Sequence, residues 1–144
     1  MNRALFALAC SAVLITGCNR PDNPSDIAED KVEHDAEAAA AAAGPTPAAL
    51  GLTEVQLLEA DLVGGNGVEL GDVKSLVRGP DGSVSQLLIE IEDSHPDKFV
   101  HVPVAGLQVV RKGNDTDLST TMTREQLNAL PSVDLTKTQG ASGT

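Results

Sequence analysis

The chain has 144 residues and a formal net charge of −11, from 10 lysines and arginines against 21 aspartates and glutamates. A chain of this length has room for one small domain. Because nucleic-acid phosphates are bound mainly by lysine and arginine, so acidic a protein is expected to have no nucleic-acid partner. Hydrophobic residues make up 41% of the chain but aromatic residues only 1%. We therefore expect an aliphatic core.

The N-terminus has the pattern of an export signal. After Arg3, residues 4–15 form an apolar run without charge, which is the length of a signal-peptide core and shorter than the roughly 18 residues of a membrane-spanning helix. The run closes on Leu-Ile-Thr-Gly-Cys at residues 14–18, which resembles the lipobox of bacterial lipoproteins. The resemblance implies a lipoprotein signal peptide at residues 1–17, cleavage before Cys18, diacylglyceryl transfer to its sulfur and N-acylation of the new terminus. The alternative is an ordinary secretory signal followed by an incidental cysteine.

The residues around the expected cleavage site predict the location of the mature chain. Two or three acyl chains on Cys18 would make release from the membrane negligible. Asn19 follows Cys18, and by resemblance to the sorting rule of enteric bacteria this favours the outer membrane. Cys10 would be removed with the signal, which leaves no pair of cysteines for a disulfide within the chain. We therefore expect a protein of the bacterial cell envelope that is lipid-anchored in the outer membrane and faces the periplasm.

Residues 18–49 are expected to form a lipid-anchored linker, here called the tether. It is rich in alanine and acidic residues, and Ile27 and Val32 are its only large apolar residues. Asp26 and Glu29 have the spacing of a capping box, and Gly44 with Pro45 stops a helix, so residues 27–43 are predicted to form an isolated helix. Such a helix would hold the domain about 25 Å from the lipid. The alternative is an acidic segment that binds a partner.

The folded domain is expected at residues 50–135, with a flexible tail at 136–144. Apolar residues alternate with polar ones in short runs separated by glycine-rich turns, a pattern that predicts a mainly β domain. Gly71 interrupts the second run and predicts a β-bulge. Thr123 with Gln126 has the form of a capping box and predicts a short C-terminal helix that ends at Pro131. The expected strands are residues 60–63, 68–77, 83–92, 99–104, 107–111 and 118–122.

Four segments of this domain together carry a family resemblance. They are residues 62–77, 81–84, 100–103 and 123–131, and in this order and spacing they resemble a PRC-barrel domain over residues 53–135. The resemblance implies a small β-barrel that serves as a protein-interaction module, without catalytic residues. The chain departs from the family at residues 92–98, where many members carry a glycine-rich stretch.

The loop after residue 92 and the strand that follows it hold candidate metal ligands. Asp93, His95, Asp97 and His101 would supply oxygen and nitrogen ligands for a divalent metal if the loop folded over its strand. The alternative, which we favour, is a solvated polar loop. Ser94 beside His95 belongs to no nucleophile motif, so we expect no enzyme activity and no cofactor.

Three outward-facing residues are candidates for an interface. In residues 83–92, Glu90 and Glu92 alternate with inward apolar residues, and Phe99 lies on the face opposite Val100. Phe99 is expected either to anchor a protein partner at a barrel rim or to plug one end of the barrel. The sequence therefore leaves three functions open: a lipid-anchored module that binds an unidentified protein, a metal-dependent sensor or enzyme that uses residues 93–101, or a purely structural envelope lipoprotein.

Overall fold

The computed structural model describes residues 23–138. The signal peptide, Cys18 and residues 139–144 of the expected tail lie outside this range. The expectation of a mainly β protein is confirmed, and none of the helices in the described part is long and apolar enough to cross a membrane. The helices are α1 (Pro24–Ala43), α2 (Glu54–Leu58), the 3₁₀ helix η1 (Val104–Gly106), α3 (Arg124–Asn128) and α4 (Leu135–Thr138).

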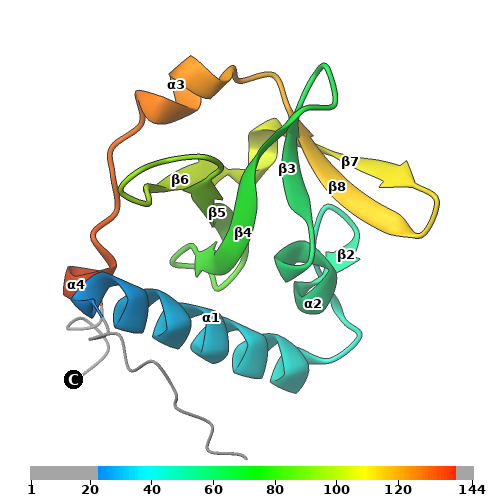
Figure 1. The fold of residues 1–144 in the computed structure, drawn as a ribbon. Helices are drawn as coiled ribbons and strands as arrows, with labels where there is room; N and C mark the ends of the chain where they lie inside the picture. Colours follow the sequence, from blue (N-terminus) through cyan, green and yellow to red (C-terminus); the bar gives the residue numbers. More distant parts are fainter. Residues whose placement is uncertain (1–22, 139–144) are drawn as a thin grey trace, which may run out of the picture.

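The strands form one sheet of six and one small hairpin (Figure 1). The order across the large sheet is β6-β5-β4-β3-β8-β7, and all neighbours are antiparallel except β3 and β8, which are parallel. No backbone ladder joins β6 to β7 within residues 23–138, so these two strands are the edges of the sheet. The large sheet is built from β3 (Asp61–Gly64), β4 (Glu69–Arg78), β5 (Val84–Ile91), β6 (Phe99–Pro103), β7 (Leu107–Lys112) and β8 (Asp115–Thr120), and the hairpin from β1 (Pro47–Ala49) and β2 (Leu52–Thr53).

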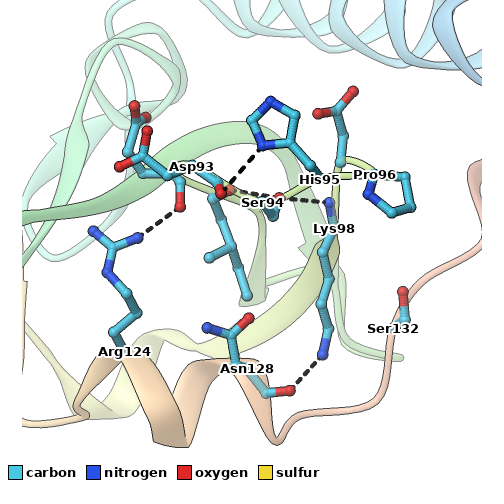
Figure 2. A pocket seen from close by; sticks show the side chains of 11 residues that line it. Asp93, Ser94, His95, Pro96, Lys98, Arg124, Asn128 and Ser132 are labelled. Atoms are coloured by element: carbon cyan, nitrogen blue, oxygen red, sulfur yellow. Dashed lines mark hydrogen bonds between the residues drawn. The ribbon is translucent and has the colours of Figure 1, made fainter.

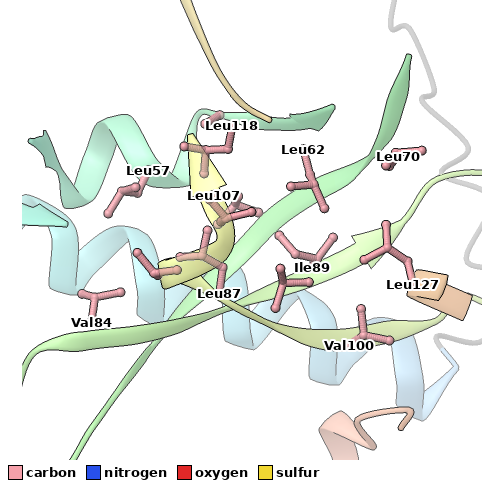
Figure 3. Close-up of a cluster of buried hydrophobic side chains, with 14 of the residues drawn as sticks. Leu57, Leu62, Leu70, Val84, Leu87, Ile89, Val100, Leu107, Leu118 and Leu127 are labelled. Atoms are coloured by element: carbon pink, nitrogen blue, oxygen red, sulfur yellow. The ribbon is translucent and has the colours of Figure 1, made fainter. Parts of the chain in front are cut away.

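One aliphatic core lies inside the curl of this sheet (Figure 3). Leu87 and Ile89 of β5 and Val100 of β6 are fully buried, as the alternation predicted. Leu107 of β7 and Leu118 of β8 belong to the same cluster. The two ends of the sheet therefore wrap around a shared core although they do not pair.

The bulge predicted at Gly71 lies beside that residue. In the β3–β4 pair, Leu62 faces Gly71 and Val63 faces Glu69, so Leu70 is the extra residue. A Cβ at Gly71 would lie 2.1 Å from the backbone oxygen of Glu90, so only glycine permits this approach of β5. Along the β4–β5 pair the register shifts again between Val73 and Ser75.

The first helix packs on the domain, and the expectation of an isolated spacer helix is wrong. The residues Ala28, Val32, Ala36 and Ala40 recur every four positions, and Ala28 and Ala40 are buried. Small side chains let α1 approach closely, and it packs against β4, α2 and α4 (Figure 1). The helix also begins at Pro24, and Asn23 at its N-cap makes no side-chain cap, so the expected capping box of Asp26 is not formed.

Among the short helices, the predicted cap of α3 is confirmed, whereas α2 and α4 were not predicted from the sequence. Thr123 and Gln126 form the predicted capping box of α3. Thr53 and Gln56 form the same box at α2, which was not predicted. Residues 136–138 of the expected tail belong to α4, whose Leu135 is buried.

Candidate functional site

The structure does not bring the four candidate metal ligands together. His95 and Asp97 are exposed on the loop at residues 92–98, and the His95 Nδ1 atom lies 3.4 Å from the Asp93 carbonyl oxygen. His101 lies on β6, where burial lowers the pKa of its imidazole. Of the four, only Asp97 belongs to a described group of side chains close enough to share an ion, and its neighbours there are Glu29 and Glu90.

Internal hydrogen bonds fix the shape of this loop. Ser94 Oγ donates to the Ile91 carbonyl over 2.7 Å and accepts from the Lys98 backbone N–H over 2.9 Å. The Ile91 N–H donates to the Lys98 carbonyl over 2.9 Å. Asp93 takes a positive φ of 59°, and the bond between His95 and Pro96 is cis. The hydroxyl of Ser94 therefore holds the loop and is not presented as a nucleophile.

This loop and α3 enclose the largest described recess near the candidate residues, with a volume of about 590 Å³. Figure 2 shows Arg124 and Lys98 on opposite sides of the recess, with Asn128 between them. Arg124 donates to the carbonyl oxygens of Glu92 and Glu69 over 2.6 and 2.9 Å, and Lys98 Nζ donates to the Asn128 carbonyl. The two cations thus tie α3 to the sheet. The sequence predicted the helix, but it held no signal that would place α3 against residues 92–98.

Glu90, a candidate interface residue, belongs to an ion cluster under α1. Lys74 Nζ lies 2.7 Å from Glu33, 2.9 Å from Glu90 and 3.6 Å from Glu29. Burial alone would lower the pKa of Lys74, but its hydrogen bonds with Glu33 and Glu90 raise it above its ordinary value. Burial, and then the charge of Glu90, raise the pKa of Glu29. The ammonium of Lys74 already supplies the cation of this cluster, so the geometry does not call for a metal there.

Phe99 and Glu92, the other candidate interface residues, also have partners in the domain. Phe99 faces away from Val100, as predicted, but only 6% of its surface is exposed. It packs with Ala28 of α1, Leu88 of β5 and Leu135 of α4. Glu92 is partly buried, and its backbone N–H donates to the Leu70 carbonyl over 3.0 Å. Phe99 is therefore a core residue of the layer between the sheet and α1.

One further acidic group was not predicted from the sequence. Carboxylate oxygens of Asp61, Glu69 and Asp72 lie within 4.8 Å of one another, where they could share a divalent cation. Burial and the neighbouring Asp72 raise the pKa of Asp61. No described contact points to an ion there, and acidic groups of this kind are expected on a surface of such high negative charge.

The chain matches no family model in a comparison with known families, and no curated protein matches it. The resemblance to PRC-barrel domains therefore stays a prediction from the order and spacing of the sequence segments.

Proposed function

We propose that this chain is a lipid-anchored lipoprotein of the bacterial cell envelope, and that its PRC-barrel-like domain is a non-catalytic module that binds a protein partner. The observation that carries the proposal is the lipobox at residues 14–18, directly after an apolar run of signal-peptide length. Thioether formation requires a thiol, and Cys18 supplies it at the position where the lipobox places it.

The domain geometry supports a binding role over a catalytic one. The segments that carry the PRC-barrel resemblance include strands of the large sheet and the capped helix α3, and the curled sheet surrounds one core. Ser94 is used in loop hydrogen bonds, and Lys98 and Arg124 are used in ties to backbone carbonyls. The alternative of a metal-dependent sensor has less support because His95 and His101 share no described ligand group. Metal analysis of the purified protein tests that alternative, and we expect no stoichiometric metal.

Metabolic labelling tests the anchor. Cells that express the chain are fed an alkyne fatty acid, and the protein is then isolated and fractionated. We expect label on the wild-type chain in the outer-membrane fraction and no label on Cys18→Ser, because a hydroxyl forms no thioether. Cys10→Ser is the matched control and should be labelled like the wild type. An unlabelled wild-type chain would refute the lipoprotein proposal.

Crosslinking tests the binding module against a purely structural role. After mild crosslinking in cells, the full-length chain is isolated and its adducts are identified by mass spectrometry. A binding module predicts one or a few discrete protein adducts whose crosslinks map to residues 50–135. Crosslinks confined to the tether, or to cell-wall material, would favour the structural alternative.

A further inference from the structure

Strand β7 is the open edge of the large sheet. It pairs only with β8 among residues 23–138 (Figure 1). The opposite edge, β6, is partly covered, because Ser132 bridges to Val100 and the Val133 N–H donates to the Phe99 carbonyl over 2.8 Å. An uncovered edge strand offers unpaired N–H and C=O groups to another chain.

The register of the β7–β8 hairpin shows which backbone groups are free. Lys112 and Asp115 close a two-residue turn in which Gly113 has a positive φ of 65°. In such a hairpin the closing pair exchanges both hydrogen bonds, and bonded pairs then alternate along the ladder. The N–H and C=O groups of Val109 and Arg111 therefore face away from β8, toward the open edge.

Arg111 is the one cation in the described part of the chain that lacks a partner. Residues 23–138 contain eight lysines and arginines, and seven of them bind a carboxylate or a backbone carbonyl. The guanidinium of Arg111 is exposed and makes no hydrogen bond or ion pair with a described residue. The engaged cations are Lys31, Lys74, Arg78, Lys98, Lys112, Arg124 and Lys137.

We propose that an extended, acidic segment of the partner protein adds to β7 as a further strand and places a carboxylate against Arg111. Main-chain bonds to Val109 and Arg111 would supply affinity, and the carboxylate would select the partner. The inference rests on the proposed function, since it assigns the surface that the binding module uses.

A second copy of this chain fits the edge less well. Strand β7 reads Leu-Gln-Val-Val-Arg-Lys and holds no carboxylate, so pairing of two β7 strands would leave both Arg111 side chains without an acidic partner. The lack of a carboxylate in β7 therefore favours an acidic strand from a different protein.

A peptide titration tests the proposal with the full-length chain in mild detergent. The probe is a blocked, fluorescent nine-residue peptide of alternating threonine and valine with one central glutamate, and its match carries glutamine instead. Fluorescence anisotropy measures both affinities. We expect the glutamate peptide to bind about two- to fivefold tighter, as one exposed ion pair allows. In Arg111→Gln the difference between the two affinities should vanish. The two proteins and the two peptides form a double-mutant cycle that measures the ion pair between Arg111 and the glutamate.

Two further variants separate the edge from the charge. Arg111→Pro removes an N–H that faces away from β8 and should abolish binding of both peptides. Lys112→Gln, which removes a neighbouring charge already bound to Asp117, should keep the preference for glutamate.

Equal binding of the two peptides to the wild type, or unchanged binding by Arg111→Pro, would overturn the proposal. So would a dimer in sedimentation that Arg111→Pro dissociates, because a second copy would then occupy the edge. These measurements need no natural partner, so a negative result would refute only the role of the β7 edge. The absence of lipid label on the wild-type chain would instead refute the proposed function.

Discussion

Replacing Lys74 by methionine should release α1 from the sheet. Lys74 bridges Glu29 and Glu33 of α1 to Glu90 of β5, and the side chains of Lys74, Glu33 and Glu90 are 17%, 40% and 20% exposed. Breaking a fully buried ion pair costs about 3–5 kcal/mol, and an exposed pair is worth about 0–1 kcal/mol. This cluster lies between those limits, so we expect Lys74→Met to destabilise docking of α1 by about 1–3 kcal/mol. The three glutamates would then repel one another across the contact.

Hydrogen exchange of residues 24–43 measures this release directly. An undocked helix of 20 residues is marginal in water, so its amides exchange when α1 opens. A loss of about 1–3 kcal/mol corresponds to exchange about 5- to 150-fold faster. Lys31→Met is the matched control on α1, because Lys31 pairs with Asp35 on the exposed face and should change protection little. Equal protection of α1 in both variants would refute the docking role of Lys74.

The pKa of Lys74 fixes the pH window for this contact. Its pKa is raised in the folded state, so its contribution to stability is complete below the ordinary value of 10.5 and is lost only as the pH rises through the folded value. Docking of wild-type α1 that depends on Lys74 should therefore persist at pH 9, after correction for intrinsic exchange. Loss of α1 protection well below pH 10 would contradict this argument.

Two further predictions concern stability of the full-length chain and are measured by urea denaturation. Gly71→Ala should destabilise the folded state by at least about 2 kcal/mol because the added Cβ would lie 2.1 Å from the Glu90 backbone oxygen. Gly106→Ala is the control and should be nearly neutral, because Gly106 has open space around it. Similar urea midpoints for the two variants would show that β5 can move aside. Phe99→Ala should cost about 3 kcal/mol because Phe99 is only 6% exposed, whereas His101→Ala on the same strand should cost less than about 1 kcal/mol. An unchanged urea midpoint for Phe99→Ala would contradict the core role of Phe99 and favour its role as an interface anchor.

Residue periodicity was sufficient to predict the strands of the large sheet and the inward faces of β5 and β6. Alternation in β5 and β6 placed Leu87, Ile89 and Val100 in the core, and each is fully buried. These predictions succeeded because a period of two fixes which side chains share a face once a strand forms. The pairing of β3 with β8 is different, since about 50 residues separate them and no local pattern encodes a parallel contact.

The docking of α1 was missed because its contact uses small and charged residues. A search for large apolar residues finds only Ile27 and Val32, and Ile27 is 54% exposed. The usable signal was the recurrence of alanine and valine every four residues, from Ala28 to Ala40, beside Glu29 and Glu33 at the same spacing. Even this spacing does not predict where α1 docks, because it does not identify Lys74 of β4 as the contact. The missed docking of α1 also explains why neither expected place for Phe99, an exposed rim or a barrel end, matches the structure: the face opposite Val100 is outward in the sheet but is covered by α1.

The docked helix changes how the proposed anchor positions the domain. A free helical spacer would extend the domain away from the lipid, but α1 lies along the domain, and its first turn meets the loop at residues 92–98 in a recess lined by Asn23, Asp26, Pro96 and Asp97. An extended chain of five residues spans at most about 18 Å, so an anchor at Cys18 would keep this end of the domain near the membrane. The tip of the β7–β8 hairpin lies instead beside α2. Helix α2 packs against α1 near its C-terminal end (Figure 1). The proposed lipid anchor and the edge at Arg111 would then lie at opposite ends of the domain, and the edge would be accessible to an acidic strand in the anchored protein.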